Sequence, residues 1–113
     1  MKDDRVYLWH IRDCLNRIFE YTQEGEEAFF QDTKTQDAVI RNLEIIGEAS
    51  RNLPGTFRSE YPDIPWRKIS DMHNKLIHEY FGVNLTMIWD IVTEILPGFR
   101  QQILDILATL AKD

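Results

Sequence analysis

The sequence predicts an all-α fold, an up-and-down bundle of four to five helices in one domain over residues 1–113. Apolar residues recur three and four positions apart through most of the chain, which is the period of a helical face. No stretch shows the sustained apolar–polar alternation of a strand, and no internal repeat or low-complexity segment appears. With 43% apolar residues, a chain of 113 residues can bury a core of its own.

The first two helices are separated by a break at Gly25-Glu26-Glu27. The first is expected from about Asp4 to Gln23, with Asp3 or Asp4 as its cap. Its apolar face comprises Leu8, Ile11, Leu15, Ile18 and Phe19. The second is expected to start at a cap on Thr33 or Thr35 and to end at Pro54-Gly55. Its face comprises Val39, Leu43, Ile46, Ser50 and Leu53, and Gly47 on this helix indicates a close helix crossing.

Three prolines, Pro54, Pro62 and Pro65, predict a loop with at most one short helical turn. Pro65 suits the first position of a third helix, which should fray near Phe81-Gly82. Its apolar residues are Trp66, Ile69, Met72, Leu76 and Ile77.

The last helical segment runs from Leu85 to Leu110, and its three-and-four spacing continues across Pro97-Gly98. This predicts one kinked helix or two collinear helices. Tryptophans at helical spacing are expected to pack in the core or in a dimer interface, and they are Trp9, Trp66 and Trp89. A lone histidine on the first helix, His10, is expected to be a packing or surface residue.

Composition limits the partners. The formal net charge of −6 argues against broad binding to nucleic acid, so no DNA partner is expected and any RNA contact must be local. No run of about eighteen apolar residues and no secretion signal appear, which predicts a soluble, cytoplasmic protein without a membrane partner. The single cysteine, Cys14, is expected to be a buried thiol without chemistry.

The segment from Ser70 to Val83 gathers two histidines, an asparagine, an acid and a tyrosine at one helix end. At about 100° per residue, His78 lies roughly 40° from Asn74 and roughly 140° from His73. His78 and Asn74 therefore share a face, and His73 looks elsewhere. Because metal-binding helices place histidines four residues apart, no metal site and no cofactor are expected here.

Several phrases of the chain together resemble one known family. They are Asp3-Asp4-Arg5-Val6-Tyr7-Leu8, the run Thr35 to Ala49, Tyr61-Pro62-Asp63-Ile64-Pro65-Trp66, and Met72-His73-Asn74-Lys75-Leu76-Ile77-His78-Glu79-Tyr80-Phe81-Gly82-Val83. In these phrases the chain resembles HepT-like proteins of the HEPN domain superfamily, whose signature is Arg, four residues, His, one residue, Tyr. The chain departs from it at one position, where the family arginine is His73.

The resemblance implies the toxin of a type VII-like HEPN/MNT toxin–antitoxin system, a metal-independent RNA endonuclease. It implies catalytic roles at His78, at position 73 and at Asn74 beside them. It also implies a homodimer with the two signature segments face to face, and an MNT-type nucleotidyltransferase antitoxin that neutralises the toxin by AMPylation of Tyr80. Arg41 and Glu48 are possible cleft residues.

His73 leaves the activity of this chain open. RNA cleavage of this type needs a base of near-neutral pKa and a cation for the developing charge, and a histidine cannot replace the arginine fork. The histidine is an engineered inactivation, a natural degeneration, or part of an active variant that uses His73 or Arg41 instead. Weak or absent activity is expected. The alternative function is a catalytically silent helical module that binds a nucleotidyltransferase partner or a nucleotide.

Overall fold

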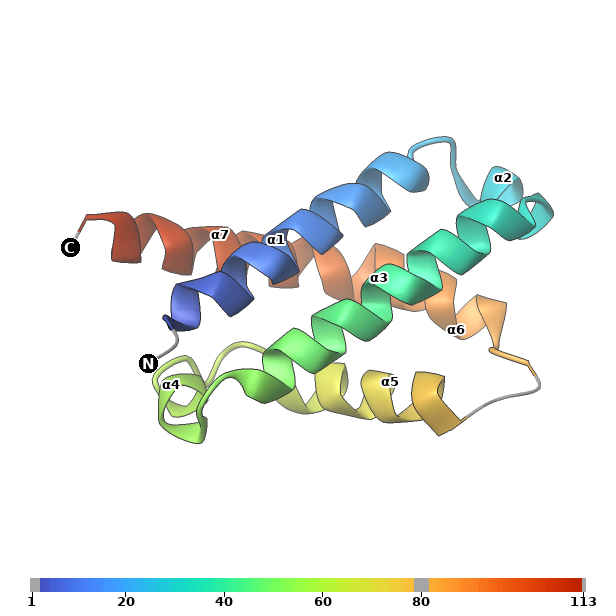
Figure 1. Cartoon of the computed structure of the whole chain (residues 1–113). Helices are drawn as coiled ribbons and strands as arrows, with labels where there is room; N and C mark the ends of the chain where they lie inside the picture. The colour runs from blue at the N-terminus through green and yellow to red at the C-terminus, as the bar shows by residue number, and fades with distance from the viewer. Residues whose placement is uncertain (1–2, 79–81, 113) are drawn as a thin grey trace.

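The computed structural model describes residues 3–78 and 82–112. Its elements are α1 (Asp4–Tyr21), α2 (Glu26–Gln31), α3 (Thr33–Asn52), α4 (Gly55–Ser59), α5 (Trp66–His78), α6 (Leu85–Asp90), the π-helical turn η1 (Ile91–Ile95) and α7 (Leu96–Ala111). The described part of the chain has no strand, which confirms the all-α prediction. The long helices run back and forth, and both chain ends lie at the end of the bundle that carries α4 (Figure 1).

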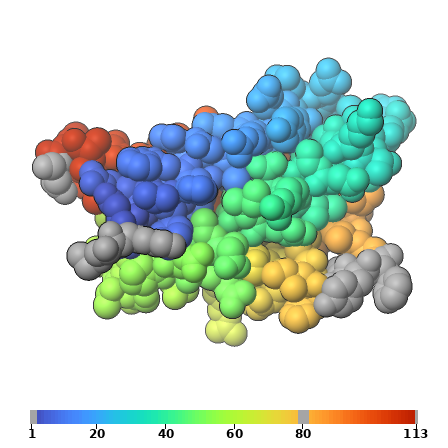
Figure 2. Space-filling view, in the orientation of Figure 1, coloured from blue at the N-terminus to red at the C-terminus, as the bar shows by residue number. Residues whose placement is uncertain are grey.

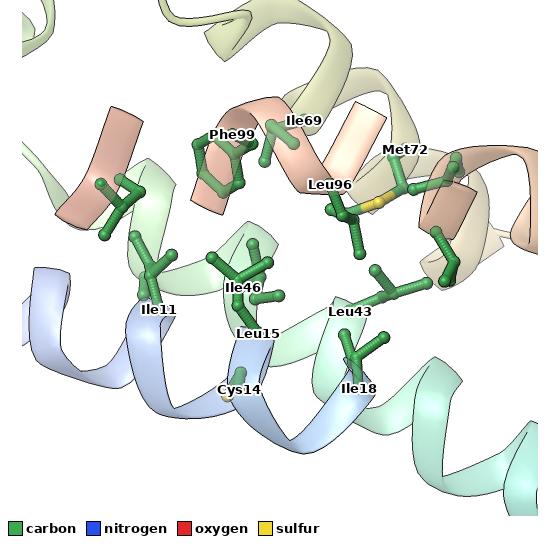
Figure 3. Close-up of a cluster of buried hydrophobic side chains, with 14 of the residues drawn as sticks. Ile11, Cys14, Leu15, Ile18, Leu43, Ile46, Ile69, Met72, Leu96 and Phe99 are labelled. Atoms are coloured by element: carbon green, nitrogen blue, oxygen red, sulfur yellow. The ribbon is translucent and has the colours of Figure 1, made fainter. Parts of the chain in front are cut away.

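The long helices pack in a simple order: α1 contacts α3 and α7, and α3 contacts α5. The three helices α1, α3 and α5 lie side by side on one face, coloured blue, green and yellow in Figure 2. Behind this face the predicted apolar stripes meet in one core (Figure 3). Its labelled members are Ile11, Cys14, Leu15, Ile18, Leu43, Ile46, Ile69, Met72, Leu96 and Phe99. Burial raises the pKa of the Cys14 thiol, so this side chain is an unreactive part of the core.

Aspartates cap the N-termini of α1 and α3. The Asp3 carboxylate accepts a hydrogen bond from the Arg5 backbone N–H at 2.9 Å, as a cap of α1 should. Asp32 does the same for α3, accepting from the Lys34 N–H at 3.0 Å and from the Thr35 hydroxyl at 2.8 Å. The expected cap at Thr33 or Thr35 is therefore wrong, because a carboxylate one position earlier satisfies the first free N–H groups.

Helix α2 was not expected, and α1 ends two residues before the predicted Gln23. The six residues of α2 bury one side chain, Phe29, so they contain too little apolar repeat to be recognised. The short α4 agrees with the single helical turn predicted between the prolines.

From Leu85 to Ala111 the chain is helical throughout, with the wider turn η1 just before Pro97. Proline has no N–H and its ring clashes with the carbonyl four residues earlier, so a π-helical turn relieves the helix at this point. No helix of the described residues is long and apolar enough to cross a bilayer.

The tryptophans divide between core and surface. Trp66 packs edge-on against Phe99 with ring centroids 6.1 Å apart, and Trp89 packs against Phe29 at 5.2 Å. Trp9 is 42% exposed, so the expectation of core packing is wrong for this residue in the single chain. It lies beside the fully buried Leu8 on the outer side of α1. Packing of Trp9 in a dimer stays a prediction.

Candidate functional site

A groove of about 620 Å³ opens on the face formed by α1, α3 and α5. Helix α3 forms the middle of the groove, and α1 and α5 form its two sides. The lining residues are Asp3, Val6, Tyr7, His10, Arg41, Glu44, Ile45, Glu48, Ala49, Asn52, His73 and Ile77. Apolar walls with a few converging charged groups are typical of a ligand or substrate site.

His73 lies in the wall of this groove and is only 2% exposed. Its ring packs on Gly47 of α3: a Cβ atom added at Gly47 would collide with Cβ, Cγ and Cδ2 of His73. The glycine therefore permits a close approach of α3 and α5, as the sequence predicted for this position.

The surroundings of His73 favour its neutral form. Burial lowers the pKa of His73, the charge of Arg51 lowers it further, and the carboxylates of Glu48 and Glu44 only partly oppose this. The Nε2 atom lies 3.5 Å from Glu48 Oε2, but a neutral imidazole makes no ion pair with it at pH 7. The Nδ1 atom is buried without a hydrogen-bond partner among the described residues. His73 thus supplies no cation to the groove.

Arg41 is the permanent cation among the described residues that line the groove. It is highly exposed and lies 3.7 Å from Glu44, an arrangement that adds little stability because water screens the pair. Arg41 and Glu48, named from sequence as possible cleft residues, both line the groove. Glu44 was missed, although it lies three residues after Arg41 and four before Glu48, on the same helical face.

Tyr7 and His10 also line the groove and were not assigned to it from sequence. His10 is an exposed residue of α1, in agreement with the expectation of a surface histidine. No local pattern could have placed these residues opposite α3, because their position depends on how the two helices cross.

His78 and Asn74 lie apart from His73. Both are exposed near the end of α5, whereas His73 is buried against α3, as the helical angles predicted. Neither residue lines the groove. Tyr80, the expected modification site, lies outside the described residues. Within residues 3–78 and 82–112, no three His, Cys, Asp or Glu side chains gather so that they could hold a metal ion.

Comparison with known proteins decides the family. The family model described as Ribonuclease HepT-like matches residues 11–106, which is most of the chain. The chain belongs to the HepT-like ribonuclease family. In this chain the part that resembles the family signature begins in α5. It has a histidine at position 73 and an exposed His78.

Three relatives illustrate how far the likeness of this HepT-like chain extends. A probable ribonuclease HepT of Thermococcus cleftensis is 48% identical over 88% of this chain and 91% of its own length. A putative RNase of Methanocaldococcus jannaschii is 43% identical over 94% of this chain and 88% of its own length. A protein of the same organism, named as a gamma-glutamylcyclotransferase and putative RNase, is 44% identical over 99% of this chain, which spans about half of that relative's length (51%). No solved structure gives a significant match.

Proposed function

We propose that this HepT-like chain is the toxin component of a type VII-like HEPN/MNT toxin–antitoxin system, built to cut RNA without a metal ion. The observation that carries the proposal is the position of His78, exposed at the end of α5 with Asn74 beside it on the same helix. An accessible imidazole nitrogen can take a proton from a substrate hydroxyl, which is the role of a general base. The names of the relatives, which are probable or putative ribonucleases, support the same chemistry.

The proposed step uses the RNA itself as nucleophile. His78 takes the proton of a ribose 2′-hydroxyl, and the freed oxygen attacks the adjacent phosphorus. The bond from phosphorus to the 5′-oxygen breaks, and that oxygen leaves as a hydroxyl after it gains a proton. The products end in a 2′,3′-cyclic phosphate and a 5′-hydroxyl. A cation at position 73 would stabilise the charge that develops on the phosphate.

A homodimer would bring the parts of this site together. In one chain His78 lies outside the groove that contains His73 and Arg41. Ile77 joins the two regions, because it lines the groove, precedes His78 directly and is 42% exposed. A two-fold partner on this face would cover Ile77 and set the signature segment of one copy against that of the other.

With His73 in place of the arginine, we propose that cleavage is slow or absent. Loss of a group that stabilises the transition state costs about 3 to 4 kcal/mol, a factor of hundreds in rate. The burial of His73 and its lowered pKa favour the second candidate function, a catalytically silent module that binds the nucleotidyltransferase or a nucleotide.

Regulation is proposed at Tyr80, where an MNT-type nucleotidyltransferase attaches AMP. The added phosphate carries negative charge and bulk two residues from His78, and would repel an RNA phosphate. The test of the proposed function compares RNA cleavage by this chain with cleavage by its His73→Arg variant. If only the variant cuts RNA, the parent is a ribonuclease inactivated by His73. If neither protein cuts RNA, the result supports the catalytically silent binding module.

A further inference from the structure

A second, smaller cavity lies where the end of α3 meets α4 and the start of α5. It is lined by Ser50, Arg51, Arg58, Trp66 and Ser70 and measures about 10 Å³, room for roughly one water-sized atom. None of these residues lines the groove that contains His73. Two arginines, two serines and a tryptophan thus line a space that fits a single oxygen atom.

Two polar atoms at this cavity have no partner among the described residues. Ser50 Oγ and Arg58 Nε are both buried without a hydrogen bond to residues 3–78 or 82–112, and Ser50 is only 5% exposed. No carboxylate of the described residues pairs with Arg51 or Arg58. Buried donors without acceptors are costly, and a buried edge of a charged guanidinium is especially so. Within the described residues, no carboxylate satisfies the donors at this cavity.

We propose that this cavity binds a phosphate group of the RNA backbone, which inserts one oxygen between Arg58 and Ser50. The Arg58 Nε–H and the Ser50 hydroxyl donate to that oxygen. The exposed Arg51 and the Ser70 hydroxyl contact the rest of the phosphate at the mouth of the cavity. Arginine is the residue best suited to phosphate, because it is always charged and offers several N–H groups in one plane. This inference rests on the proposed function, since it assumes an RNA substrate.

Charge along the chain favours RNA over a small free anion. Residues 51–78 carry five Lys and Arg against three Asp and Glu, whereas the rest of the chain carries eight against sixteen. The positive segment contains four of the five residues that line the cavity and all of α5. Ser70 lies one helical turn before His73, and α5 continues to His78. A phosphate held at Ser70 would thus position a strand along α5 toward His78, which lies about 12 Å further along the helix.

The test measures binding of a short fluorescein-labelled single-stranded RNA by anisotropy over a series of salt concentrations. Its riboses are 2′-O-methylated, so cleavage through the 2′-hydroxyl cannot occur. Arg58→Gln should weaken binding about tenfold, as expected for loss of a charge-assisted hydrogen bond. It should also reduce the slope of log K against log salt by about 0.7, which is the effect of one phosphate contact on a single strand.

Ser50→Ala removes a hydroxyl without a partner, so it should fold normally, keep the salt slope and weaken binding by a smaller factor. Arg58→Lys keeps the charge but lacks Nε and should bind more weakly than the parent. Arg12→Gln, which makes the same charge change on α1, is the matched control and should bind like the parent. Circular dichroism and thermal melting establish that each variant is folded.

Equal RNA binding by the parent, Arg58→Gln, Arg58→Lys and Ser50→Ala would overturn the proposal, as would absence of RNA binding by the parent. If inorganic phosphate raises the melting temperature of the parent but not of Arg58→Gln, while RNA binding is unchanged, the cavity is a small-anion site and the RNA inference is wrong. If His73→Arg cuts RNA but the cavity variants bind RNA like the parent, the cavity inference is wrong and the proposed nuclease function stands. If no variant cuts RNA but Arg58→Gln binds RNA weakly, the site stands and the proposed nuclease function fails.

Discussion

The imidazole of His73 occupies the space that a side chain at position 47 would need, so Gly47 and His73 form one contact between α3 and α5. The contact fixes the wall of the groove at position 73, where the signature that the chain resembles has arginine. It also explains why His73 is buried and neutral although it belongs to a segment rich in polar and titratable side chains.

Gly47→Ala should destabilise the fold by about 1 to 3 kcal/mol, because overpacking forces α3 and α5 apart. Urea unfolding measures the change in the free energy of unfolding. Gly98→Ala is the control, since a Cβ there meets nothing within 4 Å and alanine favours a helix. In a His73→Ala background the penalty of Gly47→Ala should shrink, because the ring is gone. An equal penalty in both backgrounds would show that His73 is not the obstacle.

Stability should fall with acidification because of His73. Its pKa is lowered in the folded chain, so below its ordinary value of 6.5 the unfolded chain binds the proton more readily. This contribution is complete above pH 6.5 and is lost as pH falls toward the folded pKa. Urea unfolding at pH 7.5 and pH 5.5 should show a larger loss for the parent than for His73→Gln. The same loss in both would contradict the burial argument, and His10→Gln controls for removal of an exposed histidine.

A dimer should form through the groove face. Light scattering at micromolar concentration should give twice the chain mass, and Ile77→Asp should give a monomer because it places a charge in the interface. Tyr21→Ser, which changes another large exposed side chain at the far end of α1, should remain dimeric. A monomeric parent, or an Ile77→Asp variant that stays dimeric, counts against this arrangement.

Tyr80 should be the residue modified by an MNT-type nucleotidyltransferase in the presence of ATP and Mg²⁺ or Mn²⁺. Intact-mass spectrometry should show the gain of AMP on the parent and no gain on Tyr80→Phe. Tyr21→Phe is the matched control, because Tyr21 is an exposed tyrosine on the described surface. Unchanged labelling of Tyr80→Phe would instead direct attention to Tyr7, Tyr21 or Tyr61.

Much of the fold follows from apolar spacing, because α1, α3, α5 and the helix from Leu85 each bury a stripe that repeats every three or four residues. The short α2 does not, since one buried phenylalanine makes no period. The cap at Asp32 was missed because Thr33 and Thr35, which follow it closely, are also good caps by residue type, although aspartate is the better one.

The site was only partly predictable. Helical angles separated His73 from His78, and the sequence of α3 suggested Arg41 and Glu48. The groove itself depends on the approach of α1 to α3, so Tyr7 and His10 carried no local signal. The unpartnered atoms of Ser50 and Arg58 likewise appear only once α3, α4 and α5 are packed.

The central claim is that a HepT-like active centre is present and lacks a cation at position 73. Cleavage of a labelled RNA by the parent and by His73→Arg, each in EDTA, tests it most directly. The account predicts cleavage by His73→Arg at a rate hundreds of times that of the parent, products ending in 2′,3′-cyclic phosphate, and loss of cleavage on adding His78→Ala. Inactivity of folded His73→Arg, activity that disappears in EDTA, or products ending in a 3′-hydroxyl would contradict it.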